Sequence, residues 1–98
     1  MTRVRLLRRA VLEAREASDW YAARDAKVAE DFRIALDETV ERIAAVPGIG
    51  SPWPTVPTVR RAHLRGFPYW VMYQEVEGAV VIVAVAHEKR RPDYWREP

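Results

Sequence analysis

The sequence contains no cysteine, so neither a disulfide nor a thiolate metal site can hold the chain together. Its two histidines have no tight ligand spacing, which argues against a zinc site. No apolar run approaches the roughly 20 residues that a membrane-spanning helix needs, and no apolar stretch follows the N-terminal arginines to form a signal peptide. We therefore expect a cytoplasmic protein that uses neither a metal nor a cofactor.

The motifs of several enzyme classes are missing as well. Gly48-Ile49-Gly50 follows a predicted helix instead of preceding one, so it is not a phosphate-binding loop. No serine or threonine lies in a recognisable nucleophile setting beside a histidine, and paired carboxylates occur only on the polar faces of predicted helices. Metal-free action is the favoured interpretation, in a single domain that spans residues 1–98.

Charge is distributed unevenly, although the net charge is only +2. Residues 1–12 contain four arginines and no acid, residues 13–46 contain five bases and nine acids, and residues 47–98 contain seven bases and five acids. The bases of the last segment are concentrated at residues 60–65 and 89–91. Such segregation predicts two different faces, one of which suits an anionic partner.

Two amphipathic helices are predicted early in the chain. Residues 9–24 place alanines at spacings of three and four, and residues 26–46 carry a broader apolar stripe. Asp25 is positioned to cap the second helix, and Pro47 ends it. Because almost nothing separates the two helices, we expect an antiparallel hairpin. Residues 48–57, with two glycines and three prolines, are expected to form an ordered surface connection.

The remaining elements are predicted to be strands. Val4, Leu6 and Leu7 lie among arginines as in a half-exposed strand, whose place in the sheet is left open. Three later runs are rich in Val, Ile, Tyr and Trp, at residues 59–64, 69–76 and 79–86. The short connections between them suit tight antiparallel hairpins. The predicted fold class is α+β: a strand, a helical hairpin across one face, a three-stranded antiparallel meander and a short C-terminal tail.

In order and spacing, these elements resemble a known family over essentially the whole chain. The first helix ends in WYAARD, the second ends in AVPGIG, the first hairpin reads VRRAHLRGFPYWVMYQ, and the last strand and tail read AVAHEKRRPDYW. These stretches resemble the RelE/ParE toxins of bacterial type II toxin–antitoxin systems. The resemblance implies a small α+β domain that a cognate antitoxin holds inactive by wrapping over its surface, in a hetero-oligomer.

The family divides by mechanism. RelE-like members cleave messenger RNA on the ribosome, whereas ParE-like members poison DNA gyrase and lack the ribonuclease residues. The ending HEKRRPDYW, at residues 87–95, is closer to the ParE-like pattern. The resemblance therefore implies a growth-inhibiting toxin that binds gyrase and is not an enzyme. The alternatives are a RelE-like mRNA endoribonuclease and a non-toxic module that only binds the antitoxin.

The candidate target-binding surface is basic and lies in the C-terminal half. It consists of Arg60, Arg61, Arg65, His87, Lys89, Arg90 and Arg91. The charge segregation and the resemblance motivate this assignment.

If the protein is instead a ribonuclease, the candidate catalytic residues are Arg61, Arg65, His87 and Tyr94. Attack by a 2′-hydroxyl group needs a base, an acid and cations that stabilise the phosphorane. Strand alternation predicts that Arg61, His63 and Arg65 share one face, and the tight turns predict that Arg65 and His87 lie at one end of the sheet. A solvated basic face with antitoxin contacts is the favoured alternative, and for His87 a sheet-capping role is equally open.

The aromatic residues have a structural interpretation. Tyr94 and Trp95 lie next to arginines and could stack on bases. Folding back to seal the sheet is nevertheless the favoured interpretation for both. The core beneath the helices is expected to take the helical aromatics and some of those from the hairpin, drawn from Trp20, Tyr21, Phe32, Phe67, Tyr69, Trp70 and Tyr73.

Overall fold

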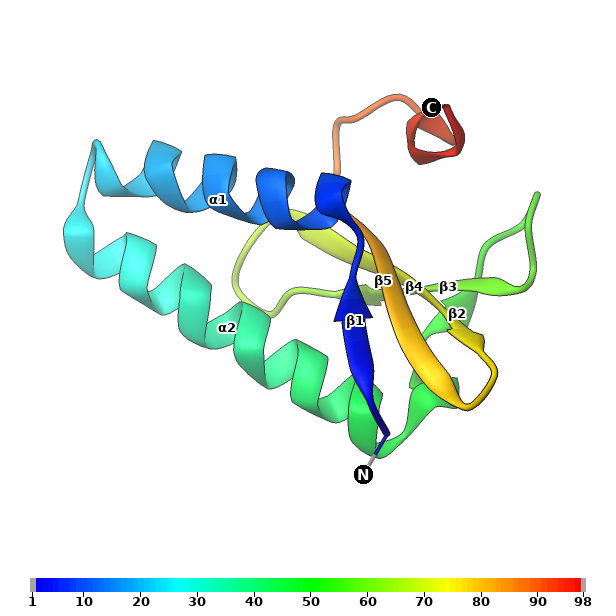
Figure 1. Ribbon diagram of the computed structural model, residues 1–98. Helices are drawn as coiled ribbons and strands as arrows, with labels where there is room; N and C mark the ends of the chain where they lie inside the picture. Colours follow the sequence, from blue (N-terminus) through cyan, green and yellow to red (C-terminus); the bar gives the residue numbers. More distant parts are fainter. Residues whose placement is uncertain (1, 98) are drawn as a thin grey trace.

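The computed structural model describes residues 2–97 as an α+β fold, in which a helical hairpin lies on one face of a five-stranded sheet (Figure 1). The elements in chain order are β1 (Val4–Leu6), α1 (Arg8–Ala22), α2 (Ala26–Ala45), the 3-10 turn η1 (Pro47–Ile49), β2 (Ser51–Pro52), β3 (Val59–His63), β4 (Tyr69–Val76), β5 (Ala79–His87) and the 3-10 turn η2 (Tyr94–Arg96). No helix described between residues 2 and 97 is long and apolar enough to cross a membrane.

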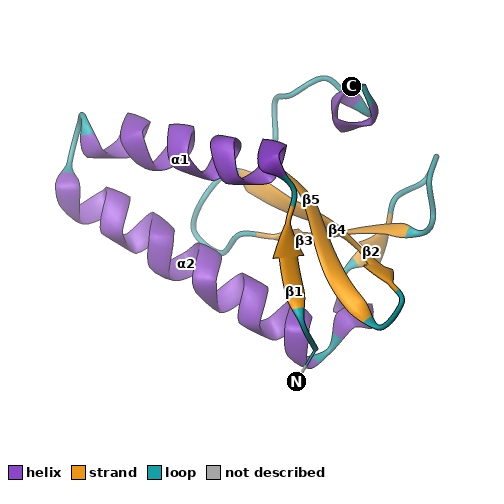
Figure 2. Cartoon of the chain, viewed as in Figure 1, coloured by secondary structure: helices purple, strands orange, loops and turns teal. Residues whose placement is uncertain are grey.

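The predicted helical hairpin is confirmed, with ends within two residues of those expected. The Asp25 side chain caps α2 by accepting a hydrogen bond of 2.9 Å from the backbone N–H of Lys27. Pro47 follows the end of α2 and opens η1, as its fixed φ and missing N–H require. The two helices run side by side in opposite directions (Figure 2).

The three-stranded meander is also confirmed. Strand β4 pairs antiparallel with both β3 and β5. Glu77 and Gly78 form the tight β4–β5 turn, with φ of 52° and 80°. Positive φ at both central residues is the conformation whose twist matches that of the flanking strands.

Strand β1 lies at the edge of the sheet and pairs parallel with β5, so the strand order is β1-β5-β4-β3-β2. Only Val80–Ile82 of β5 are paired by β1, because β1 has three residues and β5 has nine. The edge of β5 beyond Ile82 is therefore not covered by a strand. At the opposite edge, Ser51 and Pro52 add the short strand β2, which the sequence did not predict.

The face of the sheet beneath the helices, called the helix side here, holds the larger apolar core. Val71, Tyr73 and Ile82 of the sheet pack there with Ala10 of α1 and Ile43 of α2. An aromatic cluster extends this core, with ring centroids 5.3 to 5.5 Å apart, formed by Tyr21, Phe32, Phe67 and Tyr69. The prediction for Trp20 was wrong: this residue is 54% exposed and lies at an open hollow, with the guanidinium carbon of Arg24 3.6 Å from its ring centre.

The opposite face, called the tail side here, is not covered by either of the two α-helices described between residues 2 and 97. Val59, Met72 and Ala84 are buried on this face. Their cover comes from the connection before β3 and from the C-terminal residues, through Trp53, Val56, Tyr94 and Trp95. The connection is thus ordered, as predicted, because its side chains complete a second core.

Candidate functional site

The C-terminal tail, residues 88–97, folds back against the start of α1. Tyr94 is only 7% exposed, so the predicted seal over the sheet is confirmed for this residue. Its hydroxyl donates a short hydrogen bond to one carboxylate oxygen of Glu13 on α1. The other oxygen of Glu13 accepts from the backbone N–H of Val85 at 2.9 Å. Glu13 therefore covers part of the bare edge of β5 and anchors the tail at the same time.

The surroundings of Tyr94 keep its hydroxyl protonated. Burial raises the pKa of Tyr94 above its usual value of 10.0, and the hydrogen bond to Glu13 and the Glu13 charge raise it further. The guanidinium carbons of Arg90 and Arg9 lie 4.0 Å and 5.8 Å from the centre of the Tyr94 ring, so both arginines make cation–π contacts with it. Tyr94 therefore serves as an anchor and is poorly suited to exchange a proton.

A second set of polar contacts ties the tail to the connection before β3. Asp93, with φ of 63°, accepts a short hydrogen bond from the indole N–H of Trp53 and one of 2.9 Å from the Thr55 hydroxyl. The bond from Trp53 lowers the pKa of Asp93, and the bond from Thr55 and the charge of Arg96 act in the same direction. Both contacts span about 40 residues of sequence and bring two separate surface segments together.

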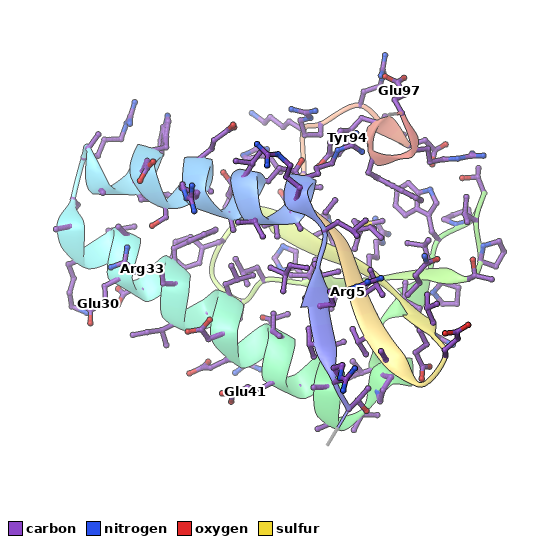
Figure 3. All side chains as sticks on the ribbon, viewed as in Figure 1. Arg5, Glu30, Arg33, Glu41, Tyr94 and Glu97 are labelled. Carbon is purple, nitrogen blue, oxygen red and sulfur yellow. The ribbon has the colours of Figure 1, made fainter. Side chains whose placement is uncertain are left out.

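The end of the tail is held at the start of α1. Arg9 donates a short hydrogen bond to the backbone carbonyl of Glu97, and Arg91 forms a short ion pair with the Glu97 carboxylate. Figure 3 labels Tyr94 and Glu97 in this position beside the first turn of α1.

Lys89, Arg90 and Arg91, called the basic tail surface here, are all exposed. Arg90 and Arg91 make the contacts with Tyr94 and Glu97 described above. The anchoring of the tail thus fixes where these positive charges stand on the protein surface.

Arg60, predicted to belong to the target-binding surface, faces the helix side and binds the chain itself. Its guanidinium donates to the carbonyl oxygens of Gly50 at 2.7 Å and Gly48 at 3.3 Å. Tyr73 also binds this loop, because its hydroxyl donates to the Pro47 carbonyl and accepts from the Gly50 N–H. A Cβ at Gly50 would lie 2.7 Å from the Tyr73 hydroxyl, so the close approach requires glycine.

Arg61 and His63 share the tail side of β3, as alternation predicts. The Arg61 guanidinium carbon lies 4.2 Å from the ring centre of Trp70 and 5.3 Å from that of Trp53. His63 Nε2 lies 3.0 Å from a carboxylate oxygen of Glu88. The placement of Arg65 on the same face was wrong, because β3 ends at His63 and a turn begins.

Arg65 instead lines a hollow of about 390 Å³ together with residues of α2 such as Glu38 and Arg42. His87 pairs with Tyr69 at the end of the sheet where the β3–β4 turn lies, as expected. Its Nδ1 accepts the Lys89 backbone N–H at 3.0 Å, and its ring contacts Tyr69 edge-on with centroids 5.1 Å apart. These contacts fit the sheet-capping interpretation of His87.

Three of the four ribonuclease candidates nevertheless line one hollow of about 200 Å³ on the tail side, namely Arg61, His87 and Tyr94. Arg90 and Arg91 line it as well, together with the acids Glu88 and Asp93, so its arginines outnumber its carboxylates by three to two. Arg65 does not line it, and the Tyr94 hydroxyl is occupied by Glu13. Between residues 2 and 97 there is no group of three histidine, cysteine, aspartate or glutamate side chains that could hold a metal ion.

Sequence reasoning missed Glu13, Trp53, Asp93 and Glu97, the residues that hold the tail. From its neighbours in the sequence, Glu13 reads as a solvent-facing helix residue, but it is half-buried and binds Val85 of β5. Its other partner, Tyr94, is 81 residues away, and no periodic pattern reports such a contact.

The fold has a counterpart among solved structures. It is similar to a chain described as "Chromosomal ParDE TA system from P. aeruginosa", with a TM-score of 0.76 and 20% sequence identity. The match covers 89% of this chain and 96% of the other. At this identity the likeness establishes the shared fold. No curated protein matches the sequence.

The sequence itself identifies the family. Residues 4–92 match the family model described as the ParE toxin of the type II toxin–antitoxin system parDE. This range includes every helix and strand and the basic tail surface, and only η2 lies beyond it. The chain therefore belongs to the ParE toxin family.

Proposed function

We propose that this ParE-family protein is a cytoplasmic toxin that arrests growth by binding DNA gyrase and that a cognate antitoxin neutralises it. The observation that carries the binding mechanism is the hydrogen bond between Tyr94 and Glu13. It removes the tail hydroxyl from acid–base chemistry, yet it fixes the exposed basic tail surface in place. An anchored, positively charged surface whose tyrosine hydroxyl is already bound suits binding better than RNA cleavage.

Pulse labelling of DNA and protein synthesis in the minutes after induction tests this proposal. The gene is expressed without an antitoxin, and incorporation of labelled thymidine and labelled methionine is followed in parallel. We expect DNA synthesis to fail first. If protein synthesis fails first, the gyrase target is wrong, and if neither fails, the protein is a non-toxic module that retains only antitoxin binding.

A ribosome-dependent mRNA endonuclease is the second candidate. The observation that favours it is the hollow that Arg61, His87 and Tyr94 share. On this alternative, His87→Ala removes mRNA cleavage in the induced cells while antitoxin binding survives. If mRNA stays intact on induction of the unmodified protein, this alternative is excluded.

A further inference from the structure

A hollow of about 550 Å³ opens on the tail side, where β1 passes into α1. Its floor consists of sheet residues that include Val59 and Val83, which are 3% and 9% exposed. Leu7 and Trp95 form apolar walls, and Arg8 and Arg96 stand at its rim. The hollow therefore has an apolar floor and arginines at its rim.

The two rim arginines are available to a partner. Among residues 2–97, no hydrogen bond or ion pair involves the guanidinium of Arg8 or of Arg96, and both side chains are exposed. The acid at this rim, Glu97, is already paired with Arg91. An occupant would thus meet positive charge that the protein does not neutralise itself.

Folding does not explain the position of Arg8, whereas its neighbour Arg9 binds the backbone carbonyl of Glu97. Arg8 opens the first turn of α1, which contains no acid. The partial positive charge of a helix N-terminus disfavours cations there and favours carboxylates. The position of Arg8 is unfavourable for the helix, so a partner with negative charge is a better explanation.

The adjoining surface extends this site. Strand β1 is the outermost strand, and no strand among the described residues pairs with its outer edge. Leu6, Leu7 and Val11 beside it are 37%, 41% and 39% exposed. An open edge offers backbone hydrogen bonds to an extended chain, and exposed aliphatic side chains offer it apolar contacts.

We propose that this arginine-rimmed hollow and the β1 edge form the docking site for an acidic, apolar peptide segment of the antitoxin. Apolar side chains of the segment enter the hollow, and its carboxylates pair with Arg8 and Arg96. The site is continuous with the tail through Trp95 and Arg96, so an occupant lies beside the segment that carries the basic tail surface. The identity of the partner rests on the proposed function.

The test uses charge reversal at the rim. The R8E/R96E variant and the unmodified protein are titrated with the full-length cognate antitoxin, and each is also induced with and without that antitoxin. We expect antitoxin affinity to fall at least tenfold, and growth arrest to persist even when the antitoxin is present. The matched control is R33E, a charge reversal on α2 away from the tail (Figure 3), which should bind the antitoxin normally.

Folding is checked by circular dichroism, and the neutral R8Q/R96Q variant provides a milder second test. Because a carboxylate suits the first turn of α1, R8E should not weaken the helix. Antitoxin affinity within twofold of normal for both variants would overturn the docking site. Loss of growth arrest with intact antitoxin binding would also overturn it and would assign the hollow to the target. If the unmodified protein causes no arrest but R8E/R96E still loses the antitoxin, the docking site stands and the proposed toxicity fails.

Discussion

The two faces of the sheet are covered in different ways. On the helix side, α1 and α2 lay periodic apolar stripes over Val71, Tyr73 and Ile82. On the tail side, irregular segments cover the sheet, and individual polar contacts hold them in place. Apolar burial is insensitive to pH and to single charges, whereas contacts with carboxylates depend on both. The helix side therefore mainly stabilises the domain, whereas the tail side mainly holds charged residues in position at the surface.

The largest expected effect comes from damage to the helix side. Phe32 is fully buried and contacts three aromatic rings, so Phe32→Ala should lower the free energy of unfolding by about 3–5 kcal/mol. Urea denaturation followed by circular dichroism measures this loss. Ile34→Ala, on the exposed face of the same helix at 47% exposure, should change it by less than about 0.5 kcal/mol.

A smaller effect is expected when the anchor of the tail is removed. Glu13→Ala leaves the Val85 N–H and the Tyr94 hydroxyl without their acceptor, which should cost about 1–3 kcal/mol. Hydrogen exchange should accelerate at Val85 while amides of α2 keep their protection. Glu16→Ala, an exposed acid on the same helix, is the control. Equal loss of protection on both faces would show that the two faces are not separable.

The smallest effect concerns pH and is confined to the tail side. Because the pKa of Asp93 is lower in the folded protein than its ordinary 3.8, the folded tail binds a proton more weakly than the unfolded tail. The resulting stabilisation is fully present above the ordinary pKa and disappears as the pH falls through the lowered one, below about pH 4. In this acidic range, the fluorescence of Trp53 and Trp95 should change as the tail detaches from the connection before β3. The Asp93→Asn variant should not show this transition.

The sequence predicted the helix side well because repeating patterns encode it. The spacing of alanines in α1, the capping position of Asp25 and the strand at Tyr69–Val76 each depend on neighbouring residues alone. The same local rules failed at Arg65, because the alternation of a strand was applied to a residue that lies beyond His63, where β3 ends.

The tail side could not be predicted in the same way. Its contacts join Glu13 to Tyr94 and Trp53 to Asp93, pairs that are 81 and 40 residues apart and that follow no period. The parallel pairing of β1 is likewise a property of the whole topology, since it depends on where the helical hairpin returns the chain. Charge segregation and the family resemblance pointed to the basic residues of the tail, but the residues that hold the tail required the structure.

The central claim is that an anchored basic tail surface acts on the target independently of the core. The most direct test reverses two of its charges, in R90E/R91E, and measures growth arrest together with the thermal unfolding of the purified protein. We predict that arrest is lost while the unfolding midpoint stays within a few degrees of normal, because both side chains are exposed and their contacts, with Tyr94 and Glu97, lie within the tail and not in the helix-side core. Undiminished arrest by this folded variant would contradict the claim.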